Sequence, residues 1–121
     1  MKRVLVVEDE PAIRDLLVWV LQIEGYEVSA AENGRRAIEM AQHDPPDLML
    51  LDLMMPGMDG YEVLQHLRDS PRLRAVPVVV MSAAARPESS DTQVKAFVAK
   101  PFDLDDLLGI VKAVLAEAQS S

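Results

Sequence analysis

The sequence predicts an α/β fold in which a parallel sheet carries helices on both faces. Apolar runs with the length of buried strands alternate with segments whose apolar residues recur at helical spacing. The alternation repeats five times along 121 residues, a length that suits one domain. Consecutive parallel strands need crossover connections, so the helices are expected to cover the faces of the sheet.

The first half of the chain contains three predicted strands and two predicted helices. Residues 4–7 form a β-branched run, read as the first buried strand. Pro11 suits the first turn of the helix that follows, because its missing N–H costs nothing there. Residues 26–31 are predicted as the second strand, and Asn33 as the cap of the second helix. Residues 48–52 are apolar up to their last position, which predicts a third strand buried on both faces.

The second half continues the pattern with two more strands. Asp59 and Glu62 have the spacing of a capping box and predict the start of the third helix. Residues 76–81 are predicted as the fourth strand and residues 96–99 as a short fifth strand. Asp103 is then expected to cap the last helix.

Polar residues stand where four of these strands end. Glu8 and Asp9 follow the first strand, Asp52 ends the third, Ser82 follows the fourth, and Lys100 follows the fifth. Ligands bind at the carboxyl ends of the strands in open α/β sheets, so these side chains are expected to share one site. Three neighbouring carboxylates repel one another, and one lysine does not balance them. Oxygen ligands in a partly solvated site suit Mg²⁺.

This set of residue types fits phosphoryl transfer. The metal and Lys100 would neutralise the phosphoryl charge, Ser82 would donate a hydrogen bond, and Asp52 would act as the nucleophile. Each residue taken alone has an ordinary alternative: a turn or cap for Asp52, a turn for Ser82 and a surface charge for Lys100. Their arrival at successive strand ends favours the functional interpretation.

Composition excludes several classes of protein. The net charge of −8 argues against direct nucleic-acid binding through a basic surface. The chain has no cysteine, hence no disulfide framework and no thiolate metal site. No signal peptide or membrane span is visible, so no contact with a membrane is expected. We therefore expect a soluble cytoplasmic protein.

Four segments resemble the signature segments of the receiver domain of bacterial two-component response regulators. They are VVEDEP at 6–11, LDLMMPGMDG at 51–60, MSA at 81–83 and KPF at 100–102. The resemblance covers essentially the whole chain, as a single receiver domain over residues 1–121. It implies a flavodoxin-like (βα)5 fold, doubly wound around a five-stranded sheet of order 2-1-3-4-5.

The resemblance also implies the function and the metal site. Asp52 would accept a phosphoryl group from a sensor histidine kinase, a phosphotransfer protein or a small phosphodonor. Glu8, Asp9, Asp52 and the backbone carbonyl of Met54 would hold Mg²⁺. Lys100 would contact the phosphoryl group, and the peptide bond that follows it would be cis. The chain would then be a signalling protein of a phosphorelay, catalysing only its own phosphorylation and dephosphorylation.

Switching is implied for two further residues, and both depart from the commonest family pattern. Ser82 would contact the phosphoryl oxygens and move toward them, and Phe97 would then turn inward. The family often has Thr in place of Ser82 and Tyr in place of Phe97. Serine keeps the hydroxyl that the chemistry needs, whereas phenylalanine removes any output that depends on a tyrosine hydroxyl.

A third departure concerns the fourth helix of the family. From Ser82 to Lys100 the chain is shorter than a typical receiver by about four residues, or one helical turn. Pro87 and the polar residues after it are poor helix formers, and Gln93 occupies the usual glycine position. We therefore expect residues 83–95 to hold a shortened or irregular helix, or a mobile loop, which would move signalling to another surface.

Several alternatives stay open at this point. A Mg²⁺-dependent phosphatase would use the same aspartate, but it usually needs an acid two positions later, where Met54 stands. A phosphorylation-independent binding module would be expected to lack acidic residues or the lysine, and all are present. A downstream effector protein, a fused output domain absent from this chain, and a homodimer are all possible partners. Trp19 and Ile23 lie off the main apolar stripe of the first helix, and either pack against the last helix or form a partner surface.

Overall fold

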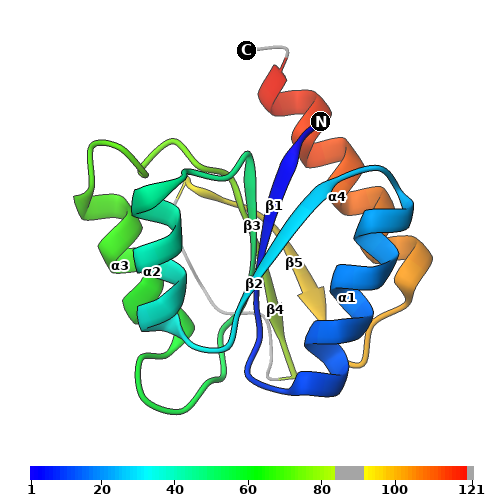
Figure 1. Ribbon diagram of the computed structural model, residues 1–121, viewed down its shortest axis with the longest axis horizontal. Coiled ribbons are helices and arrows are strands. Elements are labelled where there is room, and N and C mark those ends of the chain that lie inside the picture. Colours follow the sequence, from blue (N-terminus) through cyan, green and yellow to red (C-terminus); the bar gives the residue numbers. More distant parts are fainter. Residues whose placement is uncertain (84–91, 120–121) are drawn as a thin grey trace.

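The computed structural model is a three-layer α/β structure and describes residues 1–83 and 92–119 (Figure 1). Its elements are, in chain order, β1 (Arg3–Val7), α1 (Pro11–Ile23), β2 (Glu27–Ala31), α2 (Gly34–His43), β3 (Leu48–Asp52), α3 (Gly60–Asp69), β4 (Val78–Ser82), β5 (Val94–Ala99) and α4 (Leu104–Gln119). Within the described residues, strands and helices thus follow the predicted order.

The five strands pair in parallel in the order β2-β1-β3-β4-β5. This confirms the predicted flavodoxin-like sheet. β1 and β3 lie in the middle of the sheet, and every residue of β3 is buried. All strands end at the same edge, so the residues that follow them are brought together there.

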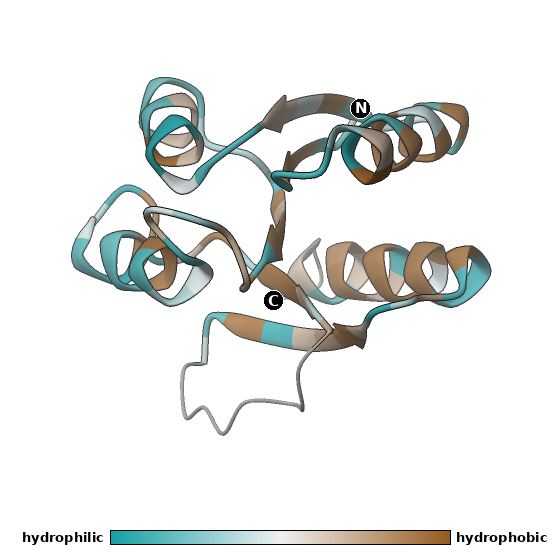
Figure 2. Ribbon diagram, turned by 90° about the horizontal axis from the view of Figure 1, so that it is seen from below, coloured by the Kyte–Doolittle hydropathy of each residue, from teal (hydrophilic) through white to brown (hydrophobic). Residues whose placement is uncertain are grey.

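The helices form two layers on opposite faces of the sheet, as Figure 2 shows. On one face, α1 and α4 pack over a cluster that includes Leu17, Leu21, Leu107 and Val111. On the other face, α2 and α3 pack over a cluster that includes Ala37, Ala41, Val63, Leu64 and Leu67. Strand residues contribute alternately to the two clusters, because successive side chains of a strand point to opposite faces.

The predicted caps are confirmed by their hydrogen bonds. The Asn33 side chain accepts from the Arg36 amide at 2.8 Å, and Asp59 Oδ1 accepts from the Glu62 amide at 3.0 Å. Asp103 Oδ1 accepts from the amide of Asp106 at 3.1 Å and precedes α4 directly. Each bond satisfies one of the amides that a helix start leaves without an intrahelical partner.

The boundaries of four strands differ from those predicted. β1 begins at Arg3, one residue earlier than expected, where Arg3 pairs with Glu27 of β2. Tyr26 lies outside β2 because its amide donates to the Leu21 carbonyl and completes the turn that ends α1. β4 is Val78–Ser82 rather than 76–81, because its ladder with β3 begins where Val78 pairs with Met49. β5 starts two residues earlier than expected, since Val94 pairs with Val78 across an irregularity in the β4–β5 ladder.

The helix or loop predicted for residues 83–95 ends before Val94, which begins β5. The prediction of a shortened or irregular helix otherwise falls on residues 84–91, outside the described residues. It therefore stays a prediction. After this segment the chain is anchored by Gln93, which is buried. Its Nε2 donates to the carbonyls of Leu73 and Val76 at 2.8 and 2.9 Å, tying the start of β5 to the connection before β4.

Two large apolar side chains of α1 face solvent. Trp19 is 61% exposed and Ile23 is 64% exposed. The alternative that they pack against the last helix is therefore wrong, and a partner surface stays a hypothesis. Across the part of the chain that the structure describes, no helix has both the length and the apolar character required to cross a membrane.

Candidate functional site

The polar residues singled out in the sequence meet at the carboxyl edge of the sheet. Glu8 and Asp9 directly follow β1, Asp52 is the last residue of β3, and Ser82 is the last residue of β4. Lys100 follows β5, and its amide donates to the Ser82 carbonyl at 2.8 Å. Strand order and register thus bring residues from four separate segments of the chain to one place.

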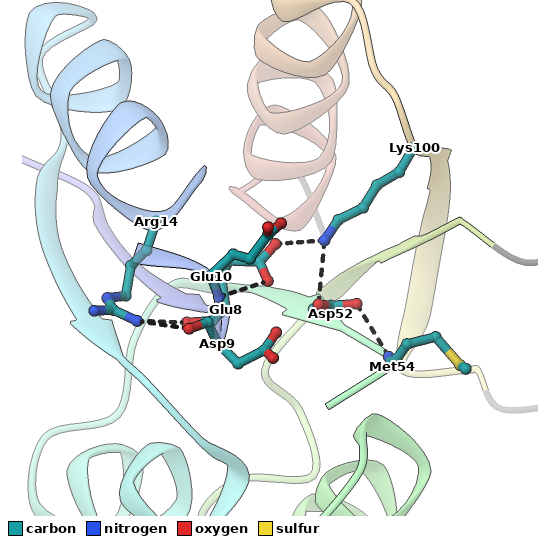
Figure 3. Close-up of polar contacts among 7 residues, drawn as sticks. All are labelled: Glu8, Asp9, Glu10, Arg14, Asp52, Met54 and Lys100. Atoms are coloured by element: carbon teal, nitrogen blue, oxygen red, sulfur yellow. Dashed lines mark hydrogen bonds and ion pairs between the residues drawn. The ribbon is translucent and has the colours of Figure 1, made fainter. Parts of the chain in front are cut away.

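Lys100 joins two buried carboxylates. Its Nζ lies 2.5 Å from Glu8 Oε1 and 3.1 Å from Asp52 Oδ2 (Figure 3). Glu8 is 0% exposed and Asp52 is 2% exposed, so both would be costly to ionise without a cation nearby. The lysine side chain provides that cation. Its peptide bond to Pro101 is cis, as the resemblance implies.

Crowding of the carboxylates changes the ionisation of Glu8. Burial, together with the neighbouring Asp52, raises the pKa of Glu8 from 4.5 to about 7, although Lys100 acts in the opposite direction. Burial by itself lowers the pKa of Lys100, but its hydrogen bonds to Glu8 and Asp52 outweigh burial and raise that pKa above its ordinary value. The lysine is therefore charged at neutral pH, and Glu8 titrates close to neutrality.

The Asp52 carboxylate is held on both of its oxygens. Oδ2 accepts from Lys100, and Oδ1 accepts from the Met54 amide at 3.0 Å. The second bond closes a local turn after β3, of the kind that aspartate often makes with the amide two residues later. The orientation of this carboxylate is therefore fixed by groups on both sides of it.

Three carboxylates lie close enough to share one metal ion. Oxygen atoms of Glu8, Asp9 and Asp52 all lie within 4.8 Å of one another. Asp9 is half-buried, whereas the other two are buried. The donor set contains only oxygen, and one lysine faces three carboxylates, so the residues fit a hard divalent cation such as Mg²⁺.

The two expected switch residues lie on the neighbouring strands β4 and β5. Ser82 is 1% exposed and pairs with Ala99 across the β4–β5 ladder. Phe97 is half-buried and packs against the core cluster shared with α2 and α3. The Met54 side chain is exposed, so it is the backbone of this residue that faces Asp52.

Sequence reasoning missed Arg14, a residue of α1. Its Nη1 donates to the backbone carbonyls of Glu8 and Asp9, at 3.0 and 3.4 Å. The sequence signal was weak, because an arginine in the first turns of an amphipathic helix is usually a solvated charge. The available clue was a basic residue near the start of the helix that follows the acidic pair.

Comparison with known proteins agrees with this geometry. The family model described as "Response regulator receiver domain" matches residues 4–112. The chain is 39% identical over 122 residues to the response regulator Rre1 of Synechocystis, covering 97% of this chain and 53% of that protein. It is 35% identical to the phosphate regulon transcriptional regulatory protein PhoB of Escherichia coli, covering 94% of this chain and 52% of that protein. The chain thus spans about half the length of these curated relatives.

Solved structures give the same result. The response regulator TrrA of Thermotoga maritima, solved in complex with Mg²⁺ and BeF, is 39% identical with a TM-score of 0.84, covering 94% of this chain and 99% of that chain. The chemotaxis protein CheY4 of Vibrio cholerae is 30% identical with a TM-score of 0.85, covering 94% of this chain and 98% of that chain. The resemblance noted in the sequence is thereby confirmed. The chain belongs to the family of response regulator receiver domains.

Proposed function

We propose that Asp52 is the phosphoacceptor of this receiver domain and that its phosphorylation switches the conformation of the protein. The observation that carries the proposal is the pair of contacts to Asp52: Lys100 on one oxygen and the Met54 amide on the other. These contacts orient a buried carboxylate at the edge of the sheet, as a nucleophile requires.

The reaction joins a phosphoryl group to the Asp52 carboxylate. A carboxylate oxygen attacks phosphorus, and the bond from phosphorus to the donor breaks as the new bond forms. The donor is either the phosphohistidine of a sensor histidine kinase or phosphotransfer protein, or a small phosphodonor. With phosphohistidine, the imidazole is the leaving group. Water later attacks phosphorus, the bond from phosphorus to the Asp52 oxygen breaks, and inorganic phosphate is released as the carboxylate is restored. The chain thus catalyses only its own phosphorylation and dephosphorylation.

The metal of this reaction is proposed to be Mg²⁺. Glu8, Asp9, Asp52 and the backbone carbonyl of Met54 would hold it, since the three carboxylates already lie within 4.8 Å of one another. When bound, Mg²⁺ supplies positive charge to the phosphoryl oxygens. Asp9 is the least buried of the three acids, and its side chain is thus the most accessible to an entering hydrated ion.

The conformational response to the phosphoryl group is proposed to involve Lys100, Ser82 and Phe97. Lys100 would leave its carboxylate partners and pair with a phosphoryl oxygen, because both charges lie at the same edge of the sheet. The Ser82 hydroxyl would donate to another phosphoryl oxygen. Phe97, half-buried next to β4, would turn inward as Ser82 moves. The hydrogen bond between Ser82 and the phosphoryl group would in this way change the surface around Phe97.

The partners of the whole protein are also part of the proposal. The relatives named above are about twice the length of this chain, which supports a regulator that controls either a fused output domain or a separate effector. We propose that it works in the cytoplasm with a histidine kinase as donor, with a homodimer as one possible output state. The receiver is not proposed to bind nucleic acid itself, because its net charge is −8.

An aspartate-based phosphatase is less well supported. Such an enzyme needs an acid–base group two residues after its nucleophile, and Met54 offers only an exposed thioether there. Turnover of phosphomonoesters by this chain would favour the phosphatase over the receiver function.

The decisive experiment is labelling with acetyl phosphate and Mg²⁺. The parent protein is expected to form an adduct that is stable in acid and labile to base and hydroxylamine, as an acyl phosphate is. Asp52→Asn should lose the adduct completely, because an amide oxygen is a poor nucleophile. Asp69→Asn is the matched control, since that aspartate is exposed at the end of α3. Equal labelling of Asp52→Asn and the parent would refute the assignment.

A further inference from the structure

Arg14 makes contacts that the proposed reaction does not use. It lies in the first turns of α1 and is half-buried. A single nitrogen, Nη1, donates to the carbonyl of Glu8 at 3.0 Å and to the carbonyl of Asp9 at 3.4 Å. This nitrogen carries two hydrogens, so one guanidinium nitrogen can serve both carbonyls at once.

These two carbonyls lie beyond the regular pairing of β1. The ladders of β1 with β2 and β3 end at Val7, so the sheet provides no ladder partner for the carbonyls that follow. The Glu8 amide is still held, by the Ala31 carbonyl at 3.1 Å. Buried or half-buried carbonyls need a donor, and the guanidinium of Arg14 takes that role where the sheet ends.

The contacts fix the direction in which the acidic side chains face. In Figure 3, Arg14 approaches the Glu8–Asp9 backbone from α1, while the two carboxylates extend toward Lys100 and Asp52. The amide of Glu10 reaches back to Glu8 Oε2 at 3.4 Å, which adds a second, local restraint. A backbone held through its carbonyls fixes the Cα–Cβ directions of Glu8 and Asp9, and so restricts the positions from which their carboxylates reach toward Asp52.

Arg14 also differs from Lys100 in the atoms that it contacts. Lys100 occupies carboxylate oxygens of Glu8 and Asp52, the same atoms that a metal ion would use. Arg14 donates instead to backbone oxygens. It therefore places a positive charge beside the acidic group and leaves the ligand oxygens available.

We propose that Arg14 is a positioning residue for the metal site: it clamps the backbone of Glu8 and Asp9 so that both carboxylates are preorganised for Mg²⁺. The inference rests on the metal-binding part of the proposed function. Residues that orient metal ligands commonly change metal affinity by roughly 10- to 100-fold when they are replaced. Arg14 acts through the backbone, so the lower end of that range is expected.

The first test is calorimetric titration of Mg²⁺ into variants of the full chain. Arg14→Gln should weaken Mg²⁺ binding by about tenfold. Arg72→Gln is the matched control: it removes the same charge from an exposed position in the connection between α3 and β4. Its affinity should stay within about twofold of the parent, because salt screens distant charges. Arg14→Lys keeps the charge but not the guanidinium, so its Mg²⁺ affinity should lie between the affinities of Arg14→Gln and Arg72→Gln.

The second test needs no metal. Amide hydrogen exchange in the metal-free protein should become faster at Glu8, Asp9 and Glu10 in Arg14→Gln, with the core strands unchanged. Equal Mg²⁺ affinity in Arg14→Gln and Arg72→Gln, together with unchanged exchange at these three amides, would overturn the inference. If Arg14→Gln does not fold, Mg²⁺ affinity and amide exchange are compared between Arg14→Lys and Arg72→Gln instead, and no difference in either would overturn the inference.

These outcomes separate the inference from the proposed function. A parent protein that fails to label at Asp52 refutes the phosphoacceptor role, while the exchange measurement still tests the clamp. Conversely, normal labelling at Asp52 combined with no effect of Arg14→Gln refutes the clamp alone.

Discussion

At the scale of single residues, Glu8 is the group whose charge depends most on its surroundings. It is fully buried, bonded to Lys100 and close to Asp52. Its carboxyl group must share one lysine with Asp52, and a proton relieves the repulsion between the two acids. A bound metal ion would relieve the same repulsion, so protons and metal compete for this residue.

The raised pKa of Glu8 predicts how stability depends on pH. The pKa of this carboxyl is about 7 in the folded protein, against 4.5 for an ordinary glutamate. Between these values the unfolded chain has lost the proton that the folded chain retains. The free energy of unfolding of the metal-free protein therefore contains a contribution that is complete below pH 4.5 and is lost as the pH rises through about 7. Its size is at most about 3 kcal/mol, before solvent screening reduces it.

Chemical denaturation in the presence of a chelator, from about pH 5 to about pH 8, measures this contribution. The difference between the parent and Glu8→Gln isolates Glu8 from the other carboxylates, because the amide does not titrate. Mg²⁺ affinity of the parent should rise over the same range, as the metal requires the ionised carboxylate. Parallel stability profiles for the two proteins would contradict the prediction.

Removal of Lys100 is predicted to strengthen Mg²⁺ binding, whereas removal of Arg14 is predicted to weaken it. The ammonium of Lys100 occupies oxygens of Glu8 and Asp52, so removing it leaves these two carboxylates without the cation that they contact. Lys100→Met should therefore bind Mg²⁺ more tightly, by about three- to tenfold, while losing the spectroscopic response to beryllofluoride. Lys112→Met, at an exposed position of α4, is the control for the loss of one positive charge. Weaker Mg²⁺ binding in Lys100→Met, measured by calorimetry on folded protein, would show that the lysine supports the metal site.

At the scale of elements, the start of α3 is joined tightly to the end of β3. Gly60 is the first residue of α3, and its amide donates to the Leu53 carbonyl at 3.1 Å. A Cβ added at Gly60 would lie 2.5 Å from Leu53 Cα and 2.8 Å from the Asp52 carbonyl oxygen. Both neighbours are backbone atoms, which cannot move aside as a flexible side chain can.

Two glycine substitutions should therefore act in opposite directions. Gly60→Ala should destabilise the protein by about 1–3 kcal/mol, as overpacking does, and should weaken Mg²⁺ binding by displacing Asp52. Gly109, inside α4, has no atom within 4 Å of an added Cβ, so Gly109→Ala should stabilise by about 0.5–1 kcal/mol without changing the metal site. Thermal unfolding with parallel Mg²⁺ titration tests both. A stabilised Gly60→Ala would mean that the contact between α3 and β3 can relax.

At the scale of the whole molecule, the site depends on the order of the strands. β5 lies two positions from β3 and three from β1 in the sheet, yet Lys100 reaches Asp52, the last residue of β3, and Glu8, which follows β1. Neighbouring strands are about 4.8 Å apart, so a short side chain after β5 would fall well short of Asp52. A long, flexible ammonium spans that distance, and the two hydrophobic clusters keep the strands in place beneath it.

The succession of elements and the residue types at the strand ends could be predicted from local patterns in the sequence. Asn33, Asp59 and Asp103 cap helices through bonds to amides three residues later, and such local bonds can be read from spacing. The acids after the first and third strands and the lysine after the fifth were likewise recognisable, because parallel strands end at one edge.

The pairing of those residues depends on the folded chain and could not be predicted from local patterns. Glu8 and Lys100 are separated by 92 positions, and their contact at 2.5 Å depends on strand order and register, which no local pattern encodes. The same applies to the different burial of Glu8 and Asp9, and to Arg14, whose contacts run to backbone atoms that a sequence pattern does not display. The start of β5 and both ends of β4 were misplaced because strand boundaries follow from pairing with a neighbour, whereas helix caps follow from bonds within a few residues.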